Sequence, residues 1–147
     1  MSFVKIILVI AIVVIVLGVS GAILLSLKSK SGSALGLIDG TLAPCPSSPN
    51  CVSSERGTPP SHRVEPLDLA VWEELPDVIV RAGGVIITRD KVYIAAEFAT
   101  PLMRFIDDVE FRKTNDEVHV RSASRVGHSD LGANAKRVEQ LRTVLSQ

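Results

Sequence analysis

An uninterrupted apolar run near the N-terminus constrains this chain more than any other feature. Ile6 to Leu27 carry no charge, and the run is interrupted only by small polar residues. As an α-helix the run would be about 33 Å long at roughly 1.5 Å per residue, which matches a bilayer hydrocarbon core of about 30 Å. The alternative is a cleavable signal peptide, but its apolar region is usually about 7–15 residues long. The run therefore predicts an uncleaved transmembrane signal anchor over residues 1–28.

The charges beside the run do not orient it, because Lys5 flanks one end and Lys28 and Lys30 flank the other. Cys45 and Cys51 are more informative, since the prolines of PCPSSPNC stiffen a short loop and bring the two thiols together. Such a pair is typical of a disulfide in an oxidising compartment. Two free thiols, or half of a zinc site without its other ligands, are the alternatives. The favoured disulfide predicts a soluble part on the periplasmic or extracytoplasmic side.

Size and charge limit the rest of the chain. Residues 29–40 are small and rich in glycine and serine, which predicts a flexible linker. Residues 41–147 then provide one globular domain, as expected for a chain of 147 residues. The 16 basic and 16 acidic residues leave no net charge, which argues against a dedicated nucleic-acid binder.

Hydrophobic spacing predicts a first helix in the domain. Leu67, Val71, Trp72 and Leu75 recur at helical spacing, so we expect a helix over residues 67–75. The lone tryptophan is expected to anchor the core beneath a sheet.

The period then changes to two, which is typical of strands. Residues 85–98 predict a hairpin, residues 103–111 a third strand and residues 118–125 a fourth, with a turn at residues 114–116. Four successive strands with short turns predict an antiparallel meander.

A second helix is predicted at the C-terminus from an apolar stripe, and its N-terminus can be capped by Asp130 or Asn134. The stripe consists of Leu131, Ala135, Val138, Leu141 and Leu145. The fold class is therefore α+β: a transmembrane helix followed by a two-layer domain, in which helices cover a four-stranded antiparallel sheet.

Three segments carry a family resemblance: PCPSSPNCVSS, RFIDDVEFR and RSASRVGHSDLGANAKRVEQLR. They resemble the domain of unknown function family 1499 from about Leu35 to the C-terminus. The resemblance implies a membrane- or envelope-associated protein, and it implies no activity and no catalytic residue. The sequence departs from the family at His128, where an aromatic residue such as Tyr is expected, so His128 gains no catalytic role from the resemblance.

Alternation along the third and fourth strands predicts two sets of polar contacts. Asp107 faces the core, where Ser122 and Ser124 are candidate hydrogen-bond partners. The opposite face gathers cations and carboxylates about 5 Å apart. These are Arg104, Asp108, Glu110, His119, Arg121 and Arg125. One interpretation is a structural polar latch of Arg104, Asp107, Asp108 and Glu110 that docks the last helix.

The same motif also predicts a binding site for an anionic ligand, either a lipid head group or an acidic metabolite. Arginines beside the N-terminus of a helix are typical of phosphate or carboxylate binding. The candidate ligand-binding residues are Arg121, Ser124, Arg125, Gly127, Asp130, Asn134 and Arg137.

Two further functional classes stay open. A hydrolase could use serine, histidine and aspartate of the same motif, although no G-x-S-x-G turn is present. A structural or protein-interaction module could instead use the proline-rich segment around the cysteines. The three histidines show no metal-ligand spacing, so neither a metal nor a cofactor is expected, and the membrane bilayer is the one partner that the sequence indicates directly.

Overall fold

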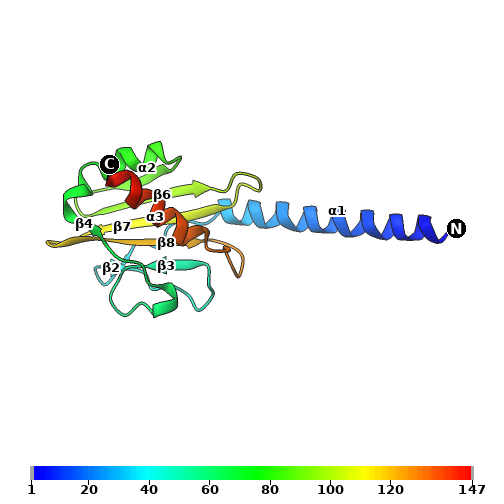
Figure 1. Ribbon diagram of the computed structural model, residues 1–147, viewed down its shortest axis with the longest axis horizontal. Helices are drawn as coiled ribbons and strands as arrows, with labels where there is room; N and C mark the ends of the chain where they lie inside the picture. The colour runs from blue at the N-terminus through cyan, green and yellow to red at the C-terminus, as the bar shows by residue number, and fades with distance from the viewer. Residues whose placement is uncertain (1, 147) are drawn as a thin grey trace.

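The apolar run forms one continuous helix, α1 (Phe3–Lys30), which projects from the domain in the computed structural model of residues 2–146 (Figure 1). Within those residues it is the one helix that is long and apolar enough to cross a membrane. Ser26 and Ser29 are its buried residues, so only the last turns of α1 contact the domain. The predicted apolar helix is confirmed by its length and composition.

The elements in chain order are α1 (Phe3–Lys30), β1 (Leu37–Ile38), β2 (Thr41–Leu42), β3 (Cys51–Ser53), the 3₁₀ helix η1 (Pro60–His62), β4 (Leu67–Asp68), the 3₁₀ helix η2 (Leu69–Trp72), α2 (Leu75–Arg81), β5 (Val85–Arg89), β6 (Tyr93–Ala99), β7 (Ile106–Lys113), β8 (Glu117–Ser124) and α3 (Ala133–Leu145).

The predicted meander is present, but the sheet is larger than expected. Strands β5, β6, β7 and β8 pair in order and antiparallel. The short strands β3 and β4 both add to the free side of β8, giving six strands instead of four. Strands of two or three residues are too short to show a period of two, and these lie in a proline-rich stretch.

The first predicted helix is wrong in its position. Leu67 belongs to β4 and pairs with Val118, and a 3₁₀ turn then leads to α2. Pro76 lies in the first turn of α2, where its missing N–H costs no helical hydrogen bond. The apolar spacing still identified core residues, because Leu67, Trp72 and Leu75 are all buried.

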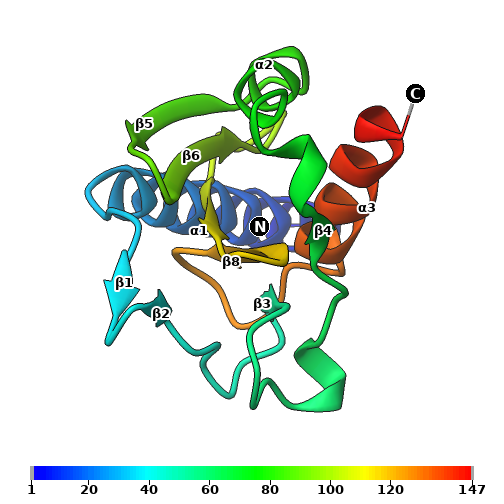
Figure 2. The same ribbon diagram turned by 90° about the vertical axis from the view of Figure 1, so that its left-hand side faces the viewer.

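Both faces of the sheet are covered, as Figure 2 shows from the end opposite α1. Helices α2 and α3 pack on one face, which holds the main hydrophobic core with Val109 and Phe111 at its centre. Residues 32–45, here called the strap, run across the other face. Leu42 of the strap packs with Tyr93 and Ala95 of β6 in a smaller apolar cluster.

Residues 29–40, predicted to be a flexible linker, make specific contacts with the sheet. The N–H of Ile106 donates to the hydroxyl of Ser29 (3.2 Å), and the N–H of Gly36 donates to the carboxylate of Glu110 (2.8 Å). These contacts use backbone groups, which leave no mark in a hydrophobic pattern. The start and the middle of this segment are therefore held against the sheet.

Two local predictions have clear outcomes. Cys45 and Cys51 form the predicted disulfide, with an S–S distance of 2.05 Å. At the C-terminal helix the N-cap position is Gly132, and the carboxylate of Asp130, two residues earlier, accepts from the first-turn N–H of Asn134 (2.7 Å). Leu131 does not belong to the apolar stripe of α3, because it precedes the helix and points outward.

Candidate functional site

A ladder of charged side chains crosses the strap-facing side of the sheet. Alternation on β7 and β8 brings these residues to one face, and the register places Glu110 opposite Arg121 and Arg112 opposite His119. The ladder consists of Glu97, Asp108, Glu110, Arg112, His119, Arg121 and Arg125, together with Glu55 from the segment after β3.

Arg125 forms the rung nearest α1. Its guanidinium donates two hydrogen bonds to Asp108 (2.8 and 2.6 Å) and a third to Glu97. These bonds, that to Asp108 first, raise the pKa of Arg125 and outweigh the opposing effect of burial. A fourth bond reaches the carbonyl of Ser29 in α1 (3.0 Å). The rung therefore joins the sheet to α1.

The middle rung is fully buried. Arg121 donates to one oxygen of Glu110 (2.8 Å), and the Tyr93 hydroxyl donates to the other (2.7 Å). Burial, and then the bond to Glu110, raise the pKa of Tyr93. The Nε–H of Arg121 has no acceptor within residues 2–146. The charges of Arg121 and Glu110 are therefore buried, and the Arg121 guanidinium is not accessible to a ligand.

The third rung lies at the end of the sheet farthest from α1. Arg112 donates a two-pronged pair of hydrogen bonds to Glu55 (2.6 and 2.8 Å), which also accepts from the N–H of Leu42 (3.0 Å). Burial alone would raise the pKa of Glu55, but the bonds from Arg112 and Leu42 and the charge of His119 lower it overall. Glu55 therefore remains ionised beneath the strap.

His119 extends this rung toward Glu117. Its Nδ1 lies 3.2 Å from the Ser54 carbonyl and 3.3 Å from the Ser54 hydroxyl. Its Nε2 lies 3.3 Å from the Glu117 carboxylate and 3.9 Å from that of Glu55.

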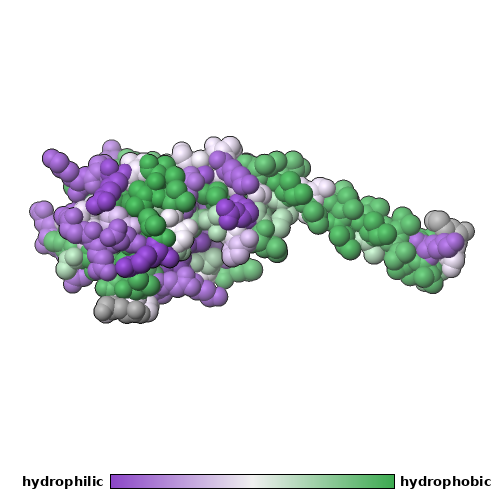
Figure 3. Space-filling model, turned by 90° about the horizontal axis from the view of Figure 1, so that it is seen from above, coloured by the Kyte–Doolittle hydropathy of each residue, from purple (hydrophilic) through white to green (hydrophobic). Residues whose placement is uncertain are grey.

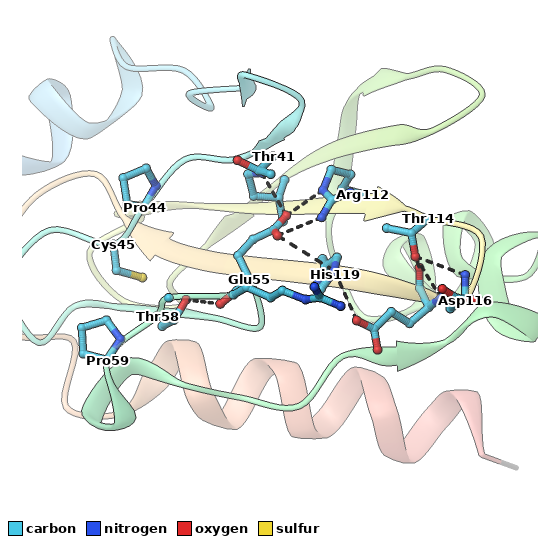
Figure 4. Close-up of a pocket in the computed structure, with 14 residues that line it drawn as sticks. Thr41, Pro44, Cys45, Glu55, Thr58, Pro59, Arg112, Thr114, Asp116 and His119 are labelled. Atoms are coloured by element: carbon cyan, nitrogen blue, oxygen red, sulfur yellow. Dashed lines mark hydrogen bonds and ion pairs between the residues drawn. The ribbon is translucent and has the colours of Figure 1, made fainter.

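The third rung forms the floor of a cleft of about 490 Å³ (Figure 4). One wall is the strap with the disulfide, a second is the loop at residues 56–59, and a third is the turn at residues 114–117. Arg56 on the second wall and Asp116 on the third are exposed, and neither has an ion pair within residues 2–146. The cleft thus presents one free cation and one free carboxylate from different walls.

The hydroxyl groups of the cleft are already engaged. Thr41 donates to the Ile38 carbonyl (3.0 Å) and Thr58 to the Glu55 carbonyl (2.7 Å). Thr114 likewise donates to a backbone carbonyl in its turn (2.8 Å). None of the three donates to a base that could activate it as a nucleophile.

A second polar network lies on the opposite face, between the sheet and α3. Asp107 is paired with Arg137 of α3 (2.8 Å), whereas the expected partners Ser122 and Ser124 bond instead to Asn134 (2.6 and 3.1 Å). Alternation along the strands could not identify Arg137 as the partner of Asp107, because that contact depends on how α3 docks on the sheet. This network attaches the last helix to the sheet.

The structure does not bring the three arginines of the motif together. Arg121 and Arg125 face the strap, whereas Arg137 belongs to α3 on the opposite face of the sheet, and each is bonded to a carboxylate. Gly127 offers its carbonyl to the Asn50 side chain (2.7 Å). Arg104 is exposed in the loop before β7, outside the ladder.

The serines and histidines of the motif are also separated. Ser122 and Ser124 lie on the helix-facing side, whereas His119 lies on the strap-facing side. Ser129 and His128 are exposed in the loop before α3. No serine, histidine and aspartate of the motif are joined by hydrogen bonds within residues 2–146.

Sequence analysis did not select three residues of the cleft: Glu55, Arg56 and Arg112. Arg112 could have been added to the ladder, because it follows Asp108 and Glu110 at steps of two. Glu55 and Arg56 lie in an irregular segment, where no pattern shows which way a side chain points.

Comparisons with known proteins give one match. A family model described as "Protein of unknown function (DUF1499)" matches residues 41–145, which include the ladder, the cleft and α3. No curated protein and no solved structure matches the chain.

Proposed function

This chain belongs to the DUF1499 family of proteins of unknown function, and we propose that it is a membrane-anchored, extracytoplasmic protein that binds a small zwitterionic ligand without catalysing a reaction. The ligand's anionic group meets Arg56, and its cationic group meets Asp116 and Glu117. The motif arginines act as a structural latch beneath this site.

The location is supported by two features at the start of the chain. Helix α1 has the length and composition of a membrane span. The disulfide between Cys45 and Cys51 is of a kind that persists in oxidising compartments. Together they favour an uncleaved anchor with the domain on the periplasmic or extracytoplasmic side.

The observation that carries the binding proposal is the free charge on opposite walls of the cleft. Arg56 and Asp116 have no ion pair among residues 2–146, whereas the floor pair of Arg112 and Glu55 is mutually neutralised. An anion alone would meet repulsion from Asp116 and Glu117, and a cation alone would meet repulsion from Arg56. A ligand with both charges satisfies all three residues.

The position of the cleft favours a water-soluble ligand over a lipid head group. Strand β7 runs from Ile106, beside α1, to Arg112 at the cleft, a distance of about 20 Å at 3.3 Å per residue. The cleft therefore opens away from the membrane. Of the two anionic ligands expected from the sequence, this position suits the metabolite, here one that also carries a cationic group.

A role without catalysis is supported by the state of the polar groups. Thr41 and Thr58 are engaged with backbone carbonyls, and the motif serines are on the other face of the sheet. The latch role of Asp107, Asp108 and Glu110 is supported by their bonds to arginines on α3 and β8. Arg104 does not contribute to that latch.

Titration calorimetry on the full chain in nanodiscs tests the proposal. The probes are an amino-acid mixture, a dicarboxylate series and a diamine series. We expect heat from a member of the first set, lost in Arg56→Ala and weakened in Asp116→Asn. Arg89→Ala, which removes an exposed arginine outside the cleft, serves as the control. Binding that survives Arg56→Ala, or binding of dicarboxylates alone, contradicts the proposal.

A further inference from the structure

Two leucines are more exposed than any other large apolar side chain of residues 31–146. Leu131 is 89% exposed and Leu102 is 88% exposed, whereas the next, Leu35, is 62% exposed. Leu102 lies in the loop between β6 and β7, and Leu131 lies in the loop between β8 and α3. One exposed leucine needs no explanation, but these two share one end of the sheet.

That end is the one from which α1 leaves the domain. Ala99 pairs with Ile106 at the start of the first loop, and Ser124 ends β8 at the start of the second. Ile106 and Arg125 both bond to Ser29 of α1. Figure 1 shows the two loops on either side of the point where α1 begins to project.

The depth of the loops is set by their contact with α1. Leu25 lines a hollow of about 300 Å³ together with Phe105 and Leu131. Leu25 belongs to the apolar run, whose length matches the hydrocarbon core of a bilayer at about 1.5 Å per residue. Figure 3 shows the hydrophobic surface of α1 continuing to its junction with the domain. The loops therefore lie at the level where the hydrocarbon region ends.

Each of the two loops contains a residue whose backbone adopts a conformation that favours glycine. Arg104 has φ 55° and Leu131 has φ 53°, both in the left-handed region that non-glycine residues rarely adopt. Hydrogen bonds fix both turns: Arg104 N–H donates to the Thr100 carbonyl (3.1 Å) and Leu131 N–H to the Ser129 hydroxyl (3.2 Å). A long side chain is thus presented outward from each loop.

Cations surround the same end of the domain. Lys28, Lys30 and Arg104 are exposed, and none of them has an ion pair within residues 2–146. Lipid phosphates lie just outside the hydrocarbon region and attract lysine and arginine at this level. Asp130, the nearest acid of the second loop, is occupied by the N–H groups of Gly132 and Asn134.

We propose that Leu102 and Leu131 insert into the leaflet in which α1 ends, while Lys28, Lys30 and Arg104 contact the lipid phosphates. This inference depends on the anchor role of α1 given above. The domain then contacts the membrane through α1, Leu102 and Leu131, which fixes its orientation relative to the bilayer. Its cleft is held facing away from the lipid.

Site-directed fluorescence on the full chain in vesicles tests this surface. The native cysteines are joined in a disulfide, so Leu102→Cys or Leu131→Cys provides one thiol for an environment-sensitive dye. The vesicles contain zwitterionic and anionic phospholipids, a fraction of them with a nitroxide on the acyl chain, placed near the head group in one sample and near the chain end in another. We expect a blue shift of emission and quenching by the nitroxide at both positions.

Two further positions separate the possible failures. Val92→Cys labels an exposed apolar residue in the turn at the opposite end of β6 and is expected to remain unquenched. Leu17→Cys labels the middle of α1 and reports whether the anchor is in the bilayer. Quenching at Leu17 without quenching at the loops overturns the inference and leaves the anchor intact. A blue shift without quenching also overturns it, because contact with a second copy of the chain has that signature. Loss of quenching at Leu17 refutes the anchor itself.

Discussion

Arg125 donates a hydrogen bond to the backbone carbonyl of Ser29 (3.0 Å), although the two residues are 96 positions apart in the sequence. The same guanidinium is held by Asp108 and Glu97 on neighbouring strands. A side chain at Gly32 would begin 2.9 Å from the Cδ of Arg125, so the chain passes directly over this group as it leaves α1. One arginine therefore links α1, the strap and the sheet.

Replacing Arg125 with alanine is expected to destabilise the domain by about 3–5 kcal/mol, because it leaves the buried carboxylate of Asp108 without its partner. Asp108 and Glu97 face each other directly across β7 and β6, so their repulsion adds to the loss. Chemical denaturation followed by the fluorescence of Trp72, the single tryptophan, measures the effect.

The control for this change is Arg142→Ala. Arg142 also donates to backbone carbonyls, those of Glu65 and Pro66, but its side chain is more exposed and bonds only to an exposed carboxylate, Glu139. We expect a loss of at most about 1 kcal/mol there. Equal losses in the two variants would show that the ladder contributes no more than a surface contact.

The buried pair of Glu110 and Arg121 predicts strongly non-additive mutations. Glu110→Leu is expected to cost about 3–5 kcal/mol, because it leaves the Arg121 charge buried and unpaired. The double variant Glu110→Leu with Arg121→Met removes both charges and is expected to recover about 1–3 kcal/mol of that loss. Recovery is incomplete because Tyr93 and the N–H of Gly36 still lose their acceptor. Additive losses in a denaturation double-mutant cycle would contradict the pairing.

The ladder shows which contacts a sequence reveals. A period of two on β7 and β8, joined by the turn at residues 114–116, is enough to place Glu110 beside Arg121, because a short turn fixes the register. The family resemblance and the disulfide were likewise predicted from local residues. Each of these depends only on neighbours in the chain or on an adjacent strand.

The missed contacts depend on the docking of separate segments. Arg137 reaches Asp107 only because α3 packs across the sheet, thirty residues further along the chain. Gly36 and Leu42 contact the ladder through backbone N–H groups, which every residue other than proline possesses. The free charge of Arg56 follows from the shape of an irregular loop, which carries no period. Most residues of the cleft therefore could not be predicted from the sequence.

Removing the disulfide is expected to affect stability and binding together. Cys45→Ser with Cys51→Ser lowers the free energy of unfolding by roughly 2 kcal/mol in the chain-entropy model, because the closed loop is short. Cys45 also lines the cleft, so the affinity for a ligand is expected to fall. Denaturation and calorimetry of the double variant check both effects, and reduction of the unmodified protein should reproduce them. Thiols that react with a maleimide before reduction would contradict the disulfide.

The third rung predicts a specific loss of stability in acid. The pKa of Glu55 in the folded protein is below its ordinary value of 4.5, so the folded state favours the ionised form. The contribution of Glu55 to the free energy of unfolding is therefore complete at pH values above its ordinary pKa. That contribution disappears as the pH falls through the lowered pKa of the folded state. Glu55→Gln is therefore less stable than the unmodified protein at neutral pH, and the difference narrows below about pH 4.5. Denaturation across this range measures the gap, with Glu65→Gln, an exposed glutamate, as the control. A gap that stays constant with pH would show that Glu55 acts through packing instead of charge.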